Sequence, residues 1–197
     1  MKRPSALSIR TENALQQPTY HKGGAMEALV TGHSSIGARR VLQLPFGAAG
    51  FLSSAAESLA FTVEGVLSLA ECRSLIAAAE SAGFSQAFVN EGRGQEVLDL
   101  EARNSDRCII DDEPFAARLF QRLRSSMPES VMDSSGGKWR LVSLNERLRL
   151  LRYKVGHSFK RHMDGHFTRS GERSFFTVIL YLNDGEEACS AAEFFGG

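Results

Sequence analysis

The sequence predicts an α+β fold in which helices come first and strands follow. Two segments with helical periodicity lie between residues 68 and 128, and three segments with the character of strands lie between residues 138 and 183. A run of helices followed by a run of strands, rather than regular alternation, is typical of α+β proteins. We therefore expect the helices to pack on a core of strands that carries the functional residues.

The first helix is predicted over "SLAECRSLIAAAESAGF", residues 68–84. Ser68 and Glu71 have the spacing of a capping box, and Gly83 suits the end of a helix. One face of this helix is predicted to be apolar, and it consists of Leu69, Cys72, Leu75, Ile76 and Ala79.

The second helix is predicted to begin at Asp111 or Asp112, with Pro114 in its first turn, and to end before Pro128. Its apolar face consists of Phe115, Leu119, Phe120 and Leu123. Between the two helices, the segment "FVNEGRGQEVLDLEARNSDR" is polar and interrupted by glycines, which favours a long loop or a pair of weak strands.

Three later segments are predicted to form strands. The first is "KWRLVSLN", and the second is "ERLRLLRYKVG", in which the alternation slips at Leu150–Leu151 and indicates a bulge or burial on both faces. The third, "RSFFTVILYLN", is rich in β-branched and aromatic residues and too apolar for a half-exposed strand, which favours a central position in the sheet.

The chain has 197 residues, which is enough for one domain with a sizeable core. We expect a disordered tail over residues 1–60 and the folded domain over residues 61–197, because the beginning of the chain is biased towards serine, glycine and basic residues. Glu12 and Glu27 are the only acidic residues among the first 40, which weakly resembles an organelle transit peptide.

Charge and cysteine content argue against several classes of partner. Lysine and arginine number 23, as do aspartate and glutamate, which argues against nucleic acid or an anionic membrane surface as the main partner. No apolar segment approaches the roughly 20 residues that span a bilayer. Cys72, Cys108 and Cys189 are few and far apart, so we expect no disulfide framework and a reducing compartment, the cytoplasm. The oligomeric state stays open.

The stretch "GHSFKRHMDGHFTRSG" concentrates four side chains that can bind metal: His157, His162, Asp164 and His166. On a strand, residues two apart share a face, so His162 and Asp164 would project together. One imidazole and one carboxylate are two of the three protein ligands of the 2-His-1-carboxylate triad, which binds non-haem Fe(II). His166 would lie too far away to join them unless the chain bends at Gly165, because three alternate ligands on one strand span about 13 Å.

Two other interpretations are open for this pair. Histidine and aspartate in a polar loop are commonly just solvated, and a zinc hydrolase uses similar ligands. The chain contains neither an H-E-x-x-H motif nor a C-x-x-C pair, which argues against the zinc hydrolase.

Residues 145–184 resemble the Fe(II)/2-oxoglutarate oxygenases of the prolyl 4-hydroxylase type. The pattern of that family is R-Y-x-x-G-x-x-F/Y-x-x-H-x-D followed by R-S-x-x-T-x-x-x-Y-L-N. At matching spacing, this chain has Arg152, Tyr153, Gly156, Phe159, His162, Asp164, Arg173, Ser174, Thr177, Tyr181, Leu182 and Asn183. The preceding segment, "RNSDRCIIDDEPFAARLFQRLRSSMP", resembles the helical region upstream of that core.

The resemblance implies that the helices pack on a double-stranded β-helix (jelly-roll) core, with His162 and Asp164 as ligands of Fe(II). In this family 2-oxoglutarate and O₂ are converted to succinate and CO₂ while a C–H bond of the substrate is hydroxylated, and L-ascorbate keeps the iron reduced. The substrate would be a peptide, modified at a prolyl residue, or a small molecule. His157 and His166 match no ligand position of the pattern.

The resemblance also implies roles for residues around the iron. Tyr153 and Thr177 would contact 2-oxoglutarate, although Tyr153 could only fill the barrel and Thr177 could only satisfy a neighbouring strand. Positions near the substrate groove are matched by Glu146, Phe159 and Arg173. Solvation at the surface explains Glu146 and Arg173 equally well.

The C-terminal part of the family pattern is missing from this chain. After "YLND" the sequence continues with "GEEACSAAEFFGG", no histidine follows His166, and no lysine or arginine follows Arg173. The third iron ligand, the basic anchor for 2-oxoglutarate and the last strands are therefore absent. We expect a fragment with little turnover alone and an unpaired, aggregation-prone strand edge near "FFTVILYL". The alternative is a non-catalytic interaction protein or a vestigial oxygenase.

Overall fold

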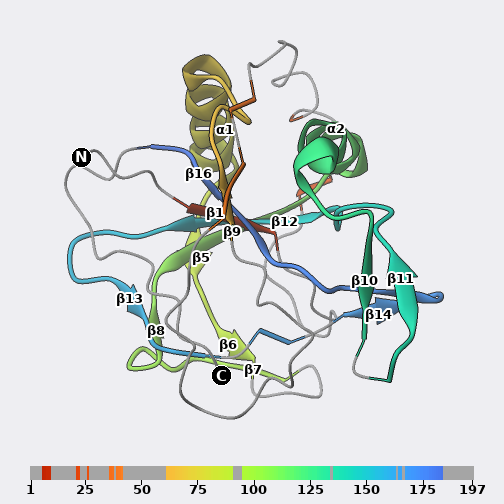
Figure 1. The fold of residues 1–197 in the computed structure, drawn as a ribbon. Coiled ribbons are helices and arrows are strands. Elements are labelled where there is room, and N and C mark those ends of the chain that lie inside the picture. The colour runs from red at the N-terminus through yellow and green to blue at the C-terminus, as the bar shows by residue number, and fades with distance from the viewer. Residues whose placement is uncertain are drawn as a thin grey trace.

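The computed structural model describes residues 6–9, 21–22, 26, 36–37, 39–41, 61–90, 95–133, 135–162, 164–165 and 167–183. Within these ranges, two helices lie on one side of a sheet, and smaller two-stranded sheets surround it (Figure 1). This arrangement confirms the predicted α+β class, with many short and mostly antiparallel strands. The jelly-roll arrangement of those strands stays a prediction.

The elements follow one another in the order β1 (Ala6–Ile9), β2 (His21–Lys22), β3 (Arg39–Val41), β4 (Phe61–Val63), α1 (Leu69–Ala82), β5 (Ser85–Gln86), β6 (Val89–Asn90), β7 (Glu96–Val97), β8 (Arg103–Asn104), β9 (Asp106–Asp111), α2 (Glu113–Leu123), the 3₁₀ turn η2 (Arg124–Ser126), β10 (Ser130–Met132), β11 (Lys138–Arg140), β12 (Arg147–Arg152), β13 (Ser158–Phe159), β14 (Thr168–Arg169), β15 (Glu172–Arg173) and β16 (Val178–Tyr181).

The main sheet of the described residues has six strands in the order β16-β1-β12-β9-β2, with β5 also pairing with β9. Leu7 of β1 lies opposite both Leu150 of β12 and Leu180 of β16, in antiparallel register on each side. Consequently β12 and β16 run parallel to each other with β1 between them. Strands β1, β2 and β3 lie within residues 1–60, for which the sequence predicts a disordered tail. The division of the chain into a tail and a domain at residue 60 stays a prediction.

Both predicted helices are confirmed, together with their caps. Ser68 and Glu71 form the reciprocal hydrogen bonds of a capping box, and α1 ends at Gly83, whose φ of 94° is a conformation that favours glycine. The side chain of Asp112 caps α2 by accepting a hydrogen bond from the backbone N–H of Phe115 at 2.9 Å. Leu69 was expected on the apolar face but is 74% exposed, because the first helical residue precedes the turns that pack on the sheet.

The core lies between the two helices and the sheet. Leu75 and Ala79 of α1 and Phe115 of α2 pack there against strand residues, among them Cys108 and Leu148. Burial of apolar area from water is the main favourable contribution to such a fold. In β12 the consecutive residues Leu148, Arg149 and Leu150 are all buried, which confirms the expected burial on both faces.

One strand was not foreseen. The sequence predicts a loop or weak strands up to Arg107 and a helix from Asp111 or Asp112, but Asp106–Asp111 forms β9, a strand with neighbours on both sides. The start of α2 at Glu113, capped by Asp112, agrees with the prediction. Arg107 in this strand is 3% exposed, and its guanidinium binds the carboxylate of Glu96 through both terminal nitrogens. A charged side chain can be buried in a strand when it has such a partner. Because Glu96 lies eleven residues before Arg107, the sequence of the strand alone does not reveal this pairing.

The third predicted strand is shorter than expected. Strand β16 covers only Val178–Tyr181, and it lies at the end of the sheet order instead of at its centre. Phe175, which precedes it, packs instead on Trp139 of β11, with ring centroids 5.3 Å apart.

No helix in the described part of the chain combines the length and the apolar content that crossing a bilayer requires.

The hairpin of β10 and β11 is closed by Asp133. Its carboxylate accepts hydrogen bonds from the backbone of Ser135 and Gly137 and, at 2.8 Å, from the indole N–H of Trp139. These donors, with the hydroxyl of Ser135 as the largest contribution, hold the pKa of Asp133 well below its usual range.

Replacing Asp133 with alanine is expected to shift the fluorescence emission of Trp139 to longer wavelength, because the indole loses its partner and the hairpin opens to water. Trp139 is the only tryptophan of the chain, so the spectrum reports on this site alone. The control is Asp133→Asn, which retains an acceptor oxygen and should shift the spectrum less. An unchanged spectrum of the alanine variant would contradict the prediction.

Candidate functional site

The structure brings His162 and Asp164 together. The Nε2 atom of His162 lies 3.3 Å from Oδ1 of Asp164, and each side chain is 38% exposed. Both residues lie in an irregular segment after β13, although the alternation of His162 and Asp164 was expected to be that of a strand. The two side chains therefore converge through the path of the loop and not through strand alternation.

The imidazole of His162 is held by the backbone of its own loop. Its Nδ1 atom lies 2.8 Å from the carbonyl oxygen of Lys160. Because a carbonyl only accepts, Nδ1 carries the hydrogen, and in the neutral ring Nε2 then presents a lone pair towards Asp164. Histidines that bind metals commonly donate their other ring N–H in this way, which selects the tautomer.

The carboxylate of Asp164 is oriented by Thr177. The hydroxyl of Thr177 donates a hydrogen bond to Oδ2 at 2.6 Å, while Oδ1 faces His162. Thr177 lies just before β16, so this bond connects the loop to the main sheet.

The distance between the two facing atoms fits a shared cation. Two ligands about 2.1 Å from one metal ion are about 3.0 Å apart at a right angle and about 3.4 Å apart at a tetrahedral angle. The observed 3.3 Å lies within that interval. A lone pair and a carboxylate oxygen at this distance repel each other unless a proton or a cation lies between them. Either a proton on Nε2 or a cation would account for the distance, and the ligand types also fit a divalent metal ion that accepts nitrogen and oxygen ligands.

The described residues supply a pair of candidate ligands. Among them, no group of three or more histidine, cysteine, aspartate or glutamate side chains is arranged to hold a metal ion. His166, which matches no ligand position of the family pattern, lies outside the described residues.

Phe159 is the third member of the site. Its ring stacks on the imidazole of His162, with centroids 3.7 Å apart and planes inclined by 18°. The guanidinium carbon of Arg103 lies 4.4 Å from the centroid of the same ring. Phe159 was expected near the substrate groove, and the structure shows it in contact with a predicted metal ligand. Arg103 was not expected at the site, because a basic residue in a polar segment is commonly exposed.

Tyr153 is not brought together with Thr177. The register through β1 places Thr177 near the level of Arg147, at the start of β12, whereas Tyr153 follows the end of β12. Six residues along a strand correspond to about 20 Å. Tyr153 instead lies near Tyr181, where burial raises the pKa of the Tyr181 phenol and Tyr153 adds to the rise.

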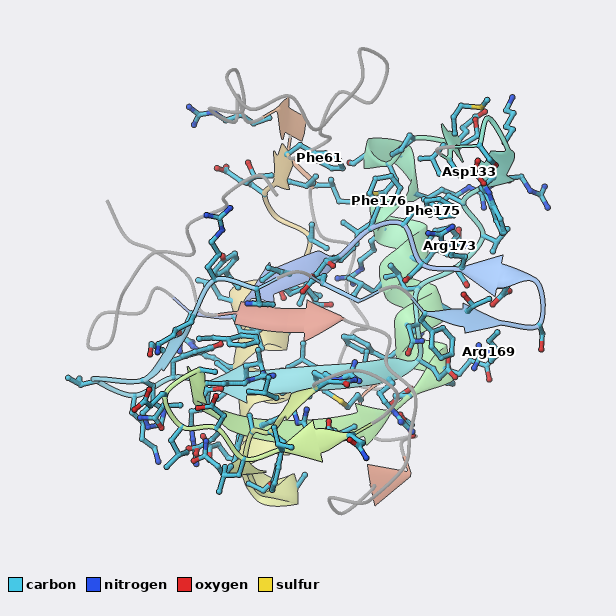
Figure 2. All side chains as sticks on the ribbon, turned by 90° about the horizontal axis from the view of Figure 1, so that it is seen from below. Phe61, Asp133, Arg169, Arg173, Phe175 and Phe176 are labelled. Carbon is cyan, nitrogen blue, oxygen red and sulfur yellow. The ribbon has the colours of Figure 1, made fainter. Side chains whose placement is uncertain are left out.

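Glu146 and Arg173 lie at the surface with partners of their own. Arg169 binds the carboxylate of Glu146 through both terminal nitrogens, and this hydrogen bonding lowers the pKa of Glu146 below its usual value. The guanidinium carbon of Arg173 lies 5.4 Å from the centroid of the Phe175 ring. Figure 2 shows Arg169, Arg173 and Phe175 on the side of the molecule that carries the Asp133 loop.

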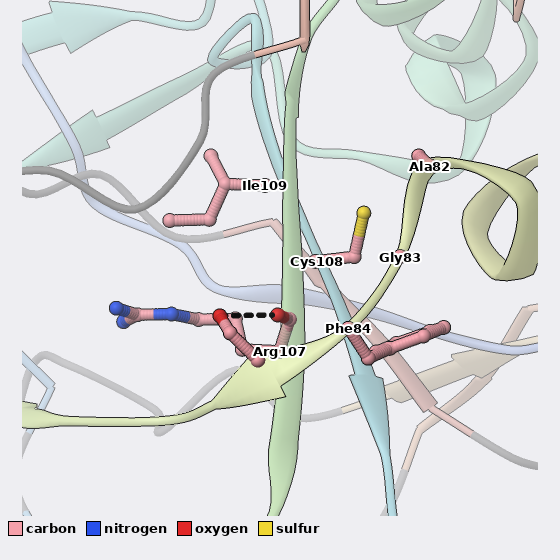
Figure 3. Close-up of a pocket in the computed structure, with 7 residues that line it drawn as sticks. Ala82, Gly83, Phe84, Arg107, Cys108 and Ile109 are labelled. Carbon is pink, nitrogen blue, oxygen red and sulfur yellow. Dashed lines mark hydrogen bonds between the residues drawn. The ribbon is translucent and has the colours of Figure 1, made fainter.

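A small cavity of about 140 Å³ lies elsewhere, between the end of α1 and β9 (Figure 3). It is lined by Ala82, Gly83, Phe84, Ser85, Arg107, Cys108 and Ile109. Burial raises the pKa of the Cys108 thiol, so this side chain stays protonated and acts as a small apolar residue. None of the predicted site residues lines the cavity.

The candidate site thus contains the predicted ligands His162 and Asp164, with Phe159 stacked on His162. Nδ1 of His162 is bound by the carbonyl of Lys160, and Oδ2 of Asp164 is bound by the hydroxyl of Thr177. Comparisons of the chain with protein-family models, with curated proteins and with solved structures found no match.

Proposed function

We propose that this chain belongs to an Fe(II)- and 2-oxoglutarate-dependent dioxygenase that hydroxylates a C–H bond, with His162 and Asp164 as iron ligands. The observation that carries the proposal is the approach of Nε2 of His162 to Oδ1 of Asp164 at 3.3 Å. A neutral imidazole with a carboxylate is the ligand chemistry that suits Fe(II), and it is also the pair expected from the family pattern. Prolyl residues of peptides are the first substrate class to test, and small molecules are the second.

When bound, Fe(II) supplies the redox chemistry that couples conversion of 2-oxoglutarate and O₂ into succinate and CO₂ to hydroxylation of the substrate. The chain's own residues bind and orient. The carbonyl of Lys160 keeps the proton on Nδ1 of His162, which leaves Nε2 available as a ligand. Asp164 supplies negative charge, and Thr177 directs which of its oxygens faces the ion.

Thr177 is better suited to orienting Asp164 than to holding 2-oxoglutarate. A hydroxyl has one hydrogen to donate, and that of Thr177 is directed at Oδ2 of Asp164. A carboxylate co-substrate needs donors, so Thr177 would have to release Asp164 to bind it. Tyr153 stays a candidate for contacting 2-oxoglutarate by its place in the family pattern.

Metal binding by the purified chain tests the proposal most directly. We expect one equivalent of Co(II), used as a spectroscopic substitute, to bind with a visible absorption spectrum, and anaerobic Fe(II) to compete with it. His162→Ala and Asp164→Ala should each abolish this binding, because each removes half of the ligand pair. The matched control is His157→Ala, which removes a histidine of the same stretch outside the pair and should bind as the wild type does.

Binding is expected to be weak and turnover slow. The chain contains no histidine after His166, so this stretch offers fewer protein ligands than the complete triad. Succinate formation from 2-oxoglutarate, with L-ascorbate present, is therefore expected to be barely above background. A wild-type chain that binds neither Co(II) nor Fe(II) would overturn the proposal and would favour the non-catalytic alternative.

A further inference from the structure

We propose that Arg103 and Phe159 are positioning residues that fix the ring plane of His162. The consequence for metal affinity rests on the function proposed above, whereas the geometry can be tested in the metal-free protein. Both residues act through the imidazole: Phe159 stacks on His162, and Arg103 contacts the ring of Phe159.

The ring of Phe159 is covered on both faces. His162 stacks on it at 3.7 Å between centroids, and the guanidinium carbon of Arg103 lies 4.4 Å from its centroid. Two planar groups this close to the centre of one ring cannot share a face without overlapping, so they lie on opposite faces. Phe159 is therefore the middle of a three-layer stack, and neither of its faces is available to a substrate.

The outer layer of this stack is anchored in the interior. Arg103 is 6% exposed, and its Nε atom donates a hydrogen bond at 3.2 Å to the hydroxyl of Ser105, which is fully buried. One of its terminal nitrogens also donates to the carbonyl of Phe88, at 3.5 Å. A cation over the face of an aromatic ring is attracted by the ring's quadrupole, and the attraction grows when water is excluded. The position of Arg103 therefore fixes the plane of Phe159.

The backbone of the same region holds the loop of His162. In the β8–β13 pair Phe159 lies opposite Arg103, and one residue later the N–H of Lys160 donates to the carbonyl of Ala102 at 2.8 Å. The carbonyl of that same Lys160 faces Nδ1 of His162. Lys160 thus binds Ala102 through its N–H and the imidazole of His162 through its carbonyl.

Asp99 shapes the turn on which this arrangement is built. Its side chain accepts hydrogen bonds from the backbone N–H groups of Glu101 and Ala102, and its carbonyl accepts one from Arg103. Residues 99–105 therefore constrain His162 twice, through the face of its ring and through Nδ1. A ligand whose ring plane is already fixed loses little freedom when it binds a metal.

Two readouts test the proposal. In the metal-free wild type, the ring protons of His162 should resonate upfield of their positions in the urea-unfolded chain, because they lie over the face of Phe159. In Phe159→Leu this upfield shift should disappear, and the affinity for Co(II) should fall about tenfold, as is typical when a partner of a metal ligand is lost.

Three further variants complete the experiment. Phe159→Tyr keeps the stack and should restore both readouts. Arg103→Lys keeps the charge but loses the planar group, so it should weaken Co(II) binding less than Phe159→Leu does. The matched control is Phe175→Leu, because the ring of Phe175 also lies beside an arginine and an aromatic residue, Arg173 and Trp139, in place of His162. It should leave both readouts unchanged.

The outcomes separate the two proposals. An unshifted His162 spectrum in the wild type would overturn the stack, and this measurement does not depend on any variant folding. Unchanged Co(II) affinity in Phe159→Leu, with the His162 protons displaced, would overturn the positioning role. A wild type with shifted His162 protons but no Co(II) binding would support the stack and overturn the metal site of the proposed function.

Discussion

Replacing Phe115 with alanine is expected to lower the free energy of unfolding by about 3–5 kcal/mol, which is the typical cost of removing a buried aromatic ring. Phe115 is completely buried where α2 meets the sheet, and it packs in the same cluster as Leu75 and Leu148. The variant loses the transfer energy of the ring and leaves a cavity that close-packed neighbours fill only in part. Urea denaturation followed by circular dichroism measures the change.

The size of this effect decides whether the variant folds at all. Domains have a total stability of about 5–15 kcal/mol, so the loss could remove a large part of it. The control is Leu69→Ala, because Leu69 is an apolar helix residue that is 74% exposed. Its replacement should change stability by about 0.5 kcal/mol or less. Equal stability losses in the two variants would contradict the packing described for α2.

Replacing Glu71 with glutamine is expected to destabilise the fold by about 3 kcal/mol at neutral pH, because it leaves the charge of Arg122 buried without its counter-ion. The side chains of Glu71 and Arg122 are 7% and 14% exposed, and their charged atoms approach to 2.8 Å. Arg122 also donates to the carbonyl of Val66, so the pair connects α2 to the segment before α1. Glutamine retains the shape and the capping oxygen of Glu71 but not the charge.

The same pair predicts how stability depends on pH. Hydrogen bonding from Arg122 lowers the pKa of Glu71 from 4.5 to about 2, against the opposing effect of burial. A depressed pKa in the folded state stabilises the protein above the unfolded value of 4.5, and this stabilisation is lost as the pH falls from 4.5 towards 2. A shift of this size corresponds to about 3 kcal/mol.

Urea titrations at pH 7, 4.5 and 3 would measure this dependence. The wild type should lose stability across the two lower values, and Glu71→Gln should lose less because it has no carboxylate there. The control is Glu80→Gln on the same helix, since Glu80 pairs with Arg152 at the surface and is 48% exposed. That variant should cost at most about 1 kcal/mol and keep the wild-type pH dependence. An identical pH dependence in wild type and Glu71→Gln would contradict the assignment.

Local interactions explain why the helices could be predicted. The capping box of α1 joins Ser68 and Glu71, and the cap of α2 joins Asp112 to Phe115. These partners are three residues apart, so the pattern is visible in the sequence itself. The candidate ligands His162 and Asp164 are only two residues apart, so the sequence pattern alone indicates this pair.

Residues that are distant in the sequence account for what could not be predicted. Strand β9 depends on pairing with β12 and on the ion pair between Arg107 and Glu96. The charged residues at both ends of its sequence, DRCIID, hide the short apolar run that would indicate a strand. Among the described residues, strand β16 pairs on one edge only, with β1, and therefore lies at the end of the sheet. Nothing in the order of residues indicates which strands meet.

By itself, the sequence determined the α+β class, the approximate positions and the caps of the two helices, and the identity of the two candidate metal ligands. Only the tertiary structure decided that Thr177 orients Asp164, that the carbonyl of Lys160 faces the imidazole, and that Arg103 and Phe159 stack on His162. The physical reason is the range of the interactions. Caps and motifs join residues a few positions apart, whereas the groups that orient the ligands include one from 59 residues before His162 and one from 13 residues after Asp164, and only the folded chain brings these groups together.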